Sequence, residues 1–410
     1  MKRTRKVNRA AGQSAPDQKS ETRESRRDLS LLGGPLHRLG LRLGLVRDGT
    51  NPIALGLVLG ALLWIVLLAL ALIEGLGHVL FSIEAIGAHV RLLVTIPLLF
   101  VCEAFIDPRF TQFVRGIERS QIVPAIALPS LESEIARVAR WKDAWLPEAL
   151  LFLAALLSAL TLQNQNVFDY LAGITGGSNP SAASNEAWTS HWYWLVCMTV
   201  FRFLLLRWLW RLALWSFFLW RVSRLELRLI PIHPDRVGGL GFLQLVHTEF
   251  IPLVLAISAA QSASLAQDIA SGRTTFDSIY SSAAILLLVD AVLFLGPLLI
   301  FSRKLWKCQV KGLDDYGAFA ERYVNEFGGK WLGAADPALE EPLLGTADIQ
   351  SLADLSNSVS IVRDMRLVPM SPSMLMYLTV AALLPLLPLL LLKYPVTDLL
   401  AKFFDGLSGL

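Results

Sequence analysis

Long blocks of apolar residues constrain the fold of this chain more than any other feature of its sequence. Blocks of about 18 to 22 residues, such as 53–73 and 279–301, have the length that a helix needs to cross the hydrocarbon core of a bilayer. Backbone groups in lipid must bond to one another, which a helix achieves within a single segment. The blocks lack the alternation of polar and apolar residues that is typical of barrel strands. The sequence therefore predicts an all-α, polytopic transmembrane helical bundle.

The composition agrees with a membrane protein. Of the 410 residues, 54% are hydrophobic and 17% are charged, whereas a soluble chain carries about 25% charged residues. Cys102, Cys197 and Cys308 have no C-x-x-C spacing, so we expect neither a disulfide framework nor a zinc site. The sequence has no nucleophile elbow, no Walker loop and no H-E-x-x-H motif. We expect no metal, no cofactor, no nucleic acid partner and no enzymatic activity.

Six or seven segments are predicted to span the membrane. Asp107-Pro108 is expected to end the second of them. The fourth helix is expected to continue to Leu229 and to project into the cytoplasm, because roughly 40 residues at about 1.5 Å each exceed the bilayer. The predicted spans are 53–73, 90–106, 146–162, the segment from Trp192 onwards, 246–266, 279–301 and 374–392.

The last predicted span, 374–392, contains two prolines. Pro385 and Pro388 should kink it, so it either crosses the membrane fully or forms a re-entrant hairpin. The regions predicted along the chain are a disordered basic tail (1–30), transmembrane helices one to six with amphipathic surface helices (31–301), a helical cytoplasmic segment (302–372), and the last transmembrane helix with a short C-terminus (373–410).

Lys and Arg gather in alternate connecting segments, which indicates the orientation of the chain. The segments 1–51, 107–145, 202–245 and 302–372 contain 33 of them, and the segments 74–89, 163–191 and 267–278 contain only Arg273. Loops rich in Lys and Arg stay on the cytoplasmic side. The polar first 30 residues do not resemble a signal peptide. We therefore expect a protein of the bacterial inner (plasma) membrane with its N-terminus in the cytoplasm.

Two charges fall near the middle of predicted spans. Arg202 lies in the fourth span and Asp290 in the sixth. Each would cost about 2.5 to 3.5 kcal/mol on an insertion scale if it faced lipid alone. At matched depth the two side chains can neutralise each other. The predicted pair either fixes the register of two helices or forms part of an ion or proton path.

The fourth helix also carries arginines on one side. They are Arg207, Arg211, Arg221 and Arg228. Their spacing differs from the every-third-residue pattern of a voltage sensor. The favoured interpretation is that these side chains snorkel to cytoplasmic headgroups, and the alternative is a basic vestibule that attracts anions.

The motif HPDRVGGLGF follows this helix. Its distinctive residues are His233, Asp235, Arg236, Gly238, Gly239 and Gly241. One hypothesis is a tight turn between the fourth and fifth helices, with Asp235 as a cap and glycines that permit positive φ. The other is an anion site, in which successive amides and Arg236 cradle a phosphate or carboxylate.

Polar and small residues mark the fifth and first spans. Ser258, Gln261 and Ser262 either line a water-filled path or bond a neighbouring helix. Gly56 and Gly60 form a GxxxG pattern, which favours close helix packing within or between subunits.

Histidines and carboxylates occur in two further places. His78 and His89 stand near Glu74 and Glu84 in an outer loop, where such groups can titrate or bind a metal, although no motif spacing supports a site. His247 and Glu249 point to different faces of a helix, so they make a poor metal pair.

Three segments together resemble a family of uncharacterised bacterial multi-pass membrane proteins. They are HPDRVGGLGFL, LLGTADIQSLADLSNS and the preceding LWRLALWSFFLWRVSRLELRLIP. The resemblance covers nearly the whole chain after residue 30. It implies the topology and location given above and brings no activity with it.

Three functions remain open from the sequence. The first hypothesis is an oligomeric channel or transporter, with Arg202, Asp290 and the polar face of the fifth span near its path. The second is a membrane scaffold or sensor that binds a cytoplasmic partner. The third is a lipid-active enzyme that uses the HPDR residues with His247 and Glu249. The expected partners are the lipid bilayer and further copies of the chain, and the sequence does not identify a cytoplasmic protein partner.

Overall fold

The computed structural model describes residues 52–162, 188–332 and 347–392. Within these ranges every regular element is a helix. Five of the described helices are long and apolar enough to cross a membrane, and a sixth is added if the bent pair Ala125–Lys142 and Trp145–Leu160 counts as one span. The predicted all-α transmembrane bundle is thereby confirmed. The expected tail, the N-terminal amphipathic helix and the C-terminus lie outside the described residues.

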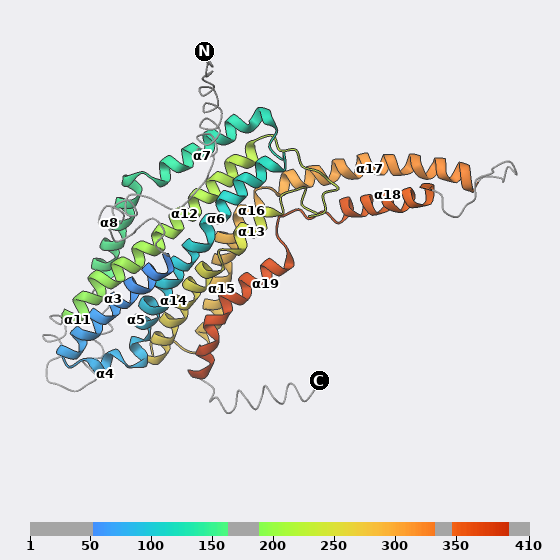
Figure 1. Ribbon diagram of the computed structural model, residues 1–410. Helices are drawn as coiled ribbons and strands as arrows, with labels where there is room; N and C mark the ends of the chain where they lie inside the picture. Colours follow the sequence, from blue (N-terminus) through green and yellow to red (C-terminus); the bar gives the residue numbers. More distant parts are fainter. Residues whose placement is uncertain (1–51, 163–187, 333–346, 393–410) are drawn as a thin grey trace, which may run out of the picture.

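The helices lie alongside one another in an elongated bundle, and a helical hairpin projects from one end (Figure 1). The α-helices are α3 (Pro52–Ile73), α4 (Gly77–Leu80), α5 (Ile86–Val90), α6 (Ile96–Arg119), α7 (Leu128–Lys142), α8 (Trp145–Leu162), α11 (Trp188–His191), α12 (Met198–Arg224), α13 (Phe242–Thr248), α14 (Ile251–Ala270), α15 (Ser278–Asp290), α16 (Gly296–Leu299), α17 (Ser302–Trp331), α18 (Ala347–Arg363) and α19 (Pro372–Leu383). The π-helical segments are η2 (Arg91–Thr95), η4 (Trp192–Cys197) and η5 (Ala291–Leu295), and the 3-10 segments are η1 (Ile83–Ala85), η3 (Ala125–Ala127) and η6 (Leu384–Leu392).

The first span packs closely on its neighbours because it carries two glycines on one face. A Cβ atom built on Gly56 would lie 2.7 Å from Cβ of Phe100, and one built on Gly60 would overlap the carbonyl oxygen of Leu92. A larger residue at either position would therefore push α3 away from α6 and η2. The GxxxG pattern thus forms a close contact within the subunit.

The helix α6 continues beyond the predicted end of the second span. It runs through Asp107-Pro108 to Arg119. After the proline, Phe110 and Phe113 are buried against Trp215 of α12, with ring centroids 4.6 and 5.1 Å apart. This aromatic packing offsets the hydrogen bond that the proline removes. The predicted end was wrong because a local helix breaker was outweighed by a tertiary contact.

The helix α12 lies in the middle of the bundle, against α6, α7 and α8 (Figure 1). It corresponds to the predicted fourth span. By length and composition, however, it is not among the described helices that could cross a membrane. It ends at Arg224, before the predicted end at Leu229. The following backbone is extended, and the amide of Arg228 donates to the carbonyl of Ile122 at 2.7 Å. Because this bond replaces a helical one, the predicted helical projection from the fourth span does not form.

The remaining spans follow the predicted order. The fifth corresponds to α13 and α14, and the sixth to α15, η5 and α16. In the seventh, α19 ends at Leu383 and the chain continues as the 3-10 helix η6, which contains Pro388. The change of helix type falls beside Pro385, where the missing N–H donors of the prolines break the α-helical pattern.

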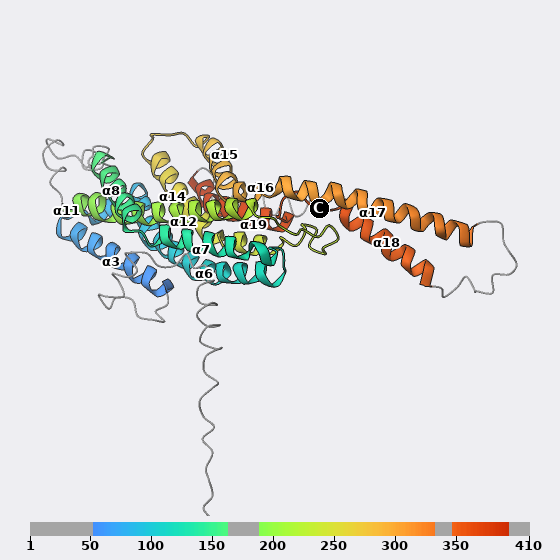
Figure 2. The same cartoon turned by 90° about the horizontal axis from the view of Figure 1, so that it is seen from above.

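The projecting hairpin consists of α17 and α18, which pack side by side, and we call it the arm (residues 302–331 and 347–363). Figure 2 shows it extending away from the bundle in the perpendicular view as well. At its base, a Cβ atom built on Gly312 would lie 2.6 Å from Cβ of Pro231 and 2.9 Å from Cγ1 of Val362. Only glycine therefore fits where α17 meets both α18 and the segment that follows α12.

Candidate functional site

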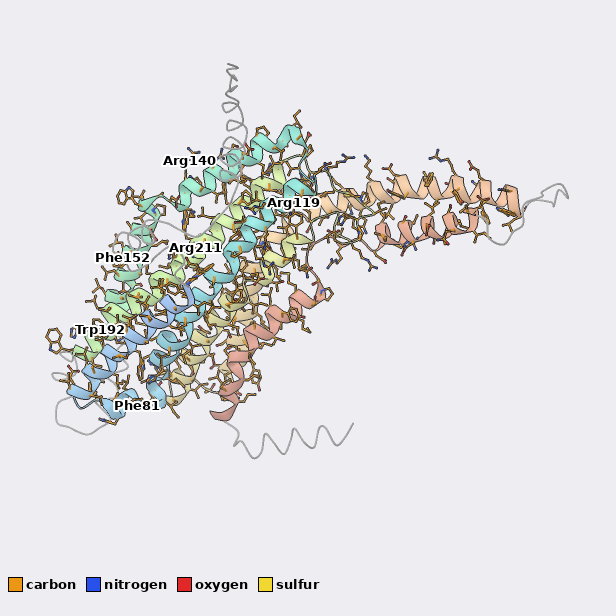
Figure 3. All side chains as sticks on the ribbon, viewed as in Figure 1. Phe81, Arg119, Arg140, Phe152, Trp192 and Arg211 are labelled. Carbon is orange, nitrogen blue, oxygen red and sulfur yellow. The ribbon has the colours of Figure 1, made fainter. Side chains whose placement is uncertain are left out.

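The arginines of α12 bond carboxylates of three neighbouring helices. The pairs are Arg207 with Glu148 of α8 at 3.2 Å, Arg211 with Glu103 of α6 at 3.0 Å, and Arg221 with Glu134 of α7 at 2.5 Å. Figure 3 shows Arg211 in the middle of the bundle. The prediction that these arginines snorkel to headgroups is wrong for Arg207 and Arg211, because both are enclosed and neutralised within the protein.

The glutamates of these pairs were not predicted from the sequence. Glu103 stands in the otherwise apolar run LPLLFVCEAFI, and that isolated charge was the available signal. Arg228, the last residue of the predicted basic face, lies beyond α12 and outside this network. Three of the four arginines of this face are therefore paired with carboxylates of neighbouring helices, and two of these, Arg207 and Arg211, are enclosed.

Arg202 and Asp290 do not form the predicted ion pair. Arg202 donates from Nη1 to the hydroxyl of Ser158 at 3.2 Å. Both carboxylate oxygens of Asp290 are buried without a hydrogen-bond partner among the described residues. The reason is lateral position, since α12 packs mainly on α6, α7 and α8, whereas α15 packs on α14 and α19. Equal depth in a membrane does not make two helices neighbours.

Arg91, which the sequence analysis did not single out, joins three elements of the bundle. Its guanidinium donates to the hydroxyl of Tyr193 in η4 and to the hydroxyl of Ser264 in α14, both at 2.7 Å. The charges of Arg91 and Arg202 interact with each other. Neither arginine has a carboxylate partner within the described residues. The signal in the sequence was a single basic residue at the end of an apolar span.

Two of the charges that lack an opposite charge stand beside π-helical segments. Arg91 is the first residue of η2, and its partner Tyr193 lies in η4. Asp290 directly precedes η5. Single π-helical turns inside α-helices occur frequently at functional sites. The irregular turns and the unneutralised charges therefore mark the same parts of the bundle.

Asp290 borders a small cavity between the sixth and seventh spans. The cavity has a volume of about 40 Å³. Its polar lining consists of Asp290 and Thr379, and the remaining lining is apolar, including Leu287, Leu375 and Leu378. A cavity of this size accommodates water, which needs roughly 10 to 15 Å³.

His247 and Glu249 have separate partners. The indole N–H of Trp215 donates to Nε2 of His247 at 3.2 Å, so Nδ1–H of His247 donates to the carbonyl of Phe294 at 2.8 Å. Glu249 pairs with Arg109 at 2.9 Å. Because both ring nitrogens of the histidine are used inside the bundle, His247 does not join the HPDR residues in one catalytic set.

The HPDRVGGLGF motif forms a turn around the carboxylate of Asp235. That carboxylate accepts hydrogen bonds from the amides of Val237, Gly239 and Gly241 at 2.9, 3.1 and 2.8 Å. Gly238 and Gly239 have φ of 67° and 97°, and Arg236 has φ of 57°. The amides that could cradle an external anion thus already bind a carboxylate of the chain itself, which favours the turn over the anion site.

The same turn holds the end of the arm. Arg366 donates to the carbonyl of Asp235 at 2.9 Å, and its amide donates to the carbonyl of Arg236 at 2.7 Å. His233 contacts the Asp235 carboxylate at 2.8 Å. A Cβ atom built on Gly238 would lie 3.3 Å from Cε of Met365. The motif therefore fixes the chain between α18 and α19.

The polar residues of the fifth span mostly bond the seventh span. Ser258 donates to the carbonyl of Ala382, and Ser262 donates to the carbonyl of Pro385 at 2.5 Å. Gln261 lies on the exposed side of α14. The two serines stabilise helix packing next to the prolines, where carbonyls have lost their helical donors.

The outer histidines and glutamates are separated by their own contacts. The indole of Trp64 donates to Nδ1 of His89 at 2.9 Å, and Nε2 of His89 bonds the carbonyl of Leu80. Glu74 accepts from the amides of Trp188 and Thr189, which caps the start of α11. No group of three or more His, Cys, Asp or Glu residues is placed to hold a metal ion in the described part of the chain.

No protein-family model, no curated protein and no solved structure matches this chain. The resemblance to a family of bacterial multi-pass membrane proteins therefore stays a prediction.

Proposed function

We propose that this protein is a channel or transporter of the bacterial inner membrane that moves a small anion, with Arg91 and Arg202 as the recognising charges. The proposal rests on a difference between two sets of arginines in the bundle. The arginines Arg207, Arg211 and Arg221 each have a carboxylate within 3.2 Å. Arg91 and Arg202 bond only neutral hydroxyl groups among the described residues.

A charged side chain within a span is expensive and usually serves an ion pathway, a relay or a ligand. Arg91 and Arg202 repel each other, so an anion that binds near both would lower the energy of the bundle. Guanidinium groups suit this role because they stay charged and donate in a planar fork.

We also propose an orientation of the chain in the membrane. The arm and the segment after α12 lie on the side rich in Lys and Arg, so they face the cytoplasm. The N-terminus lies on the same side. Arg91 and Tyr193 then stand toward the opposite face, where an anion would arrive from outside the cytoplasm or leave the protein.

The test is anion flux into liposomes that contain the purified protein. We expect flux of chloride, nitrate or phosphate above that of empty liposomes, and a decrease of at least tenfold in Arg91→Gln and Arg202→Gln. Arg273→Gln serves as the matched control, since Arg273 forms an exposed pair with Asp268 at 2.7 Å and should leave flux unchanged. Cation flux alone, or equal flux in all variants, would reject the proposal.

A second function, docking of a cytoplasmic partner, has one observation in its favour. Trp306, Val310, Leu313 and Val324 are exposed on α17 and, at successive intervals of 4, 3 and 11 residues, share one face. Apolar stripes of this kind commonly meet another helix. A photo-crosslinker placed at Val324 in intact cells tests this function, and it predicts one discrete crosslinked species.

A further inference from the structure

The side chain of Asp290 has an environment unlike that of any other charged group discussed above. It is 6% exposed, and neither carboxylate oxygen has a hydrogen-bond partner among the described residues. The paired carboxylates differ, because Glu103 bonds Arg211 and Glu148 bonds Arg207. An ionised carboxylate without partners is far more costly inside a protein than a protonated one. Burial without a partner therefore favours the protonated, neutral form of the Asp290 carboxyl group.

The cavity beside Asp290 is large enough to hold water next to the carboxyl group. Its volume of about 40 Å³ admits water. Thr379, on α19, contributes the second polar group of the lining. Water in this space can accept the proton of the carboxyl group, which leaves a carboxylate and a hydronium ion, and the reverse transfer restores the acid.

The cavity has too few oxygen ligands to bind a divalent metal cation. One carboxyl group and one hydroxyl group face the cavity, and the other lining side chains are apolar. Calcium takes six to eight oxygen ligands and magnesium prefers six. A proton is the cation that so few oxygen atoms can bind.

The neighbouring elements bring no other titratable side chain to the cavity among the described residues. On α13, His247 approaches from the side of η5 but uses both ring nitrogens on Trp215 and Phe294. On α14, Asp268 pairs with Arg273. The lining residues of α19 are uncharged. Among the described residues, Asp290 is therefore the titratable group of this cavity.

We propose that Asp290 and the cavity between α15, η5 and α19 form a reversible proton-binding site within the membrane. The irregular turn η5 begins at the next residue, which agrees with the frequent occurrence of π-helical turns at functional sites. This site is separate from the pair Arg91 and Arg202, so the inference does not depend on the anion that the protein moves.

The test is labelling with dicyclohexylcarbodiimide, a hydrophobic reagent that reacts with protonated carboxyl groups in apolar surroundings. Wild-type protein in liposomes is labelled over a range of pH, and the modified peptides are quantified by mass spectrometry. We expect the label on Asp290 near neutral pH, with loss of labelling as the pH rises. Glu103 is the internal control, because its ion pair with Arg211 should keep it unlabelled.

Three results would overturn the inference: no label on Asp290 at any pH, equal labelling of Asp290 and Glu103, or protection of Asp290 by sodium at constant pH. The last would assign the site to a metal cation instead. Asp290→Asn should remove the label from this peptide, and the peptide comparison in wild-type protein remains decisive if that variant does not fold. Labelling requires no transport, so its failure is distinguishable from the absence of anion flux.

Discussion

The carboxylate of Glu103 lies 3.0 Å from the guanidinium of Arg211, with side chains that are 9% and 6% exposed. The pair connects α6 to α12 in the interior of the bundle. Arg211 also lies over the ring of Trp208, 5.2 Å from its centroid. Because both charges are enclosed, removal of either one would leave the other buried without compensation.

Glu103→Gln should destabilise the protein strongly. Removal of one partner leaves the other charge buried and uncompensated, which costs about 3 to 5 kcal/mol. Thermal unfolding in detergent measures the loss. Asp268→Asn, which removes an exposed ion pair, is the control and should cost only about 0 to 1 kcal/mol. Equal effects of the two variants would contradict the expected role of burial.

Gly60→Ala should loosen the first span. The added Cβ would overlap the carbonyl oxygen of Leu92, so the backbone of α3 or η2 must move. Overpacking of this kind costs about 1 to 3 kcal/mol. Gly116→Ala on α6 is the matched control, because a Cβ there meets no atom within 4 Å and should stabilise the helix by about 0.5 to 1 kcal/mol. Opposite shifts of the unfolding temperature are the expected result.

Asp235→Ala should release the turn that holds the arm. The substitution leaves the amides of Val237, Gly239 and Gly241 without their acceptor, at a cost of about 1 to 3 kcal/mol for each donor that stays buried. Hydrogen exchange should become faster at these amides. Asp364→Ala, which removes a carboxylate 3.9 Å from Arg236, should leave exchange unchanged. Unaltered exchange in Asp235→Ala would show that the carboxylate does not order the turn.

The tip of the arm should open in acid. Hydrogen bonds from Lys330 and Trp331 lower the pKa of Asp348, which lies outside the membrane-spanning segments. A group with a lowered pKa stabilises the folded state at pH values above its unfolded pKa of about 3.9, and this stabilisation is lost as the pH falls through the folded pKa. The fluorine NMR signal of Trp331 in protein labelled with 5-fluorotryptophan, assigned by its absence in Trp331→Phe, should shift in that range. Asp348→Asn should abolish the pH-dependent change, and a change that persists would point to another group.

Sequence reasoning succeeded where one segment decides the outcome. The apolar blocks predicted the helical class and the five described helices that are long and apolar enough to cross a membrane, whereas the fourth predicted span does not meet that criterion. Gly56 and Gly60 indicated a close helix contact, and of the two hypotheses for Asp235 the turn agrees with the structure, because both signals depend on local spacing. Pro385 and Pro388 predicted an interruption of the last span, and the α-helix ends there, although the 3-10 helix that follows was not predicted.

It failed where two distant segments must be brought together. Matched depth suggested that Arg202 and Asp290 pair, but depth carries no information about which helices are neighbours. The helix through Pro108 depends on aromatic contacts with α12, which the sequence of α6 alone does not contain. Arg91 was overlooked because its partners, Tyr193 and Ser264, come from other parts of the chain.

The attachment of the arm has a mechanical consequence. The 30 residues of α17 make a rod of about 45 Å at about 1.5 Å per residue, which follows α16 after a short turn. Gly312 and Arg366 fasten only its base. From Gly312 to Trp331 the rod continues for 19 residues, or about 29 Å, so a rotation of about 5° at Gly312 would sweep its tip through about 2.5 Å. The arm can therefore act as a lever that turns small rotations at the end of the sixth span into larger displacements at its tip.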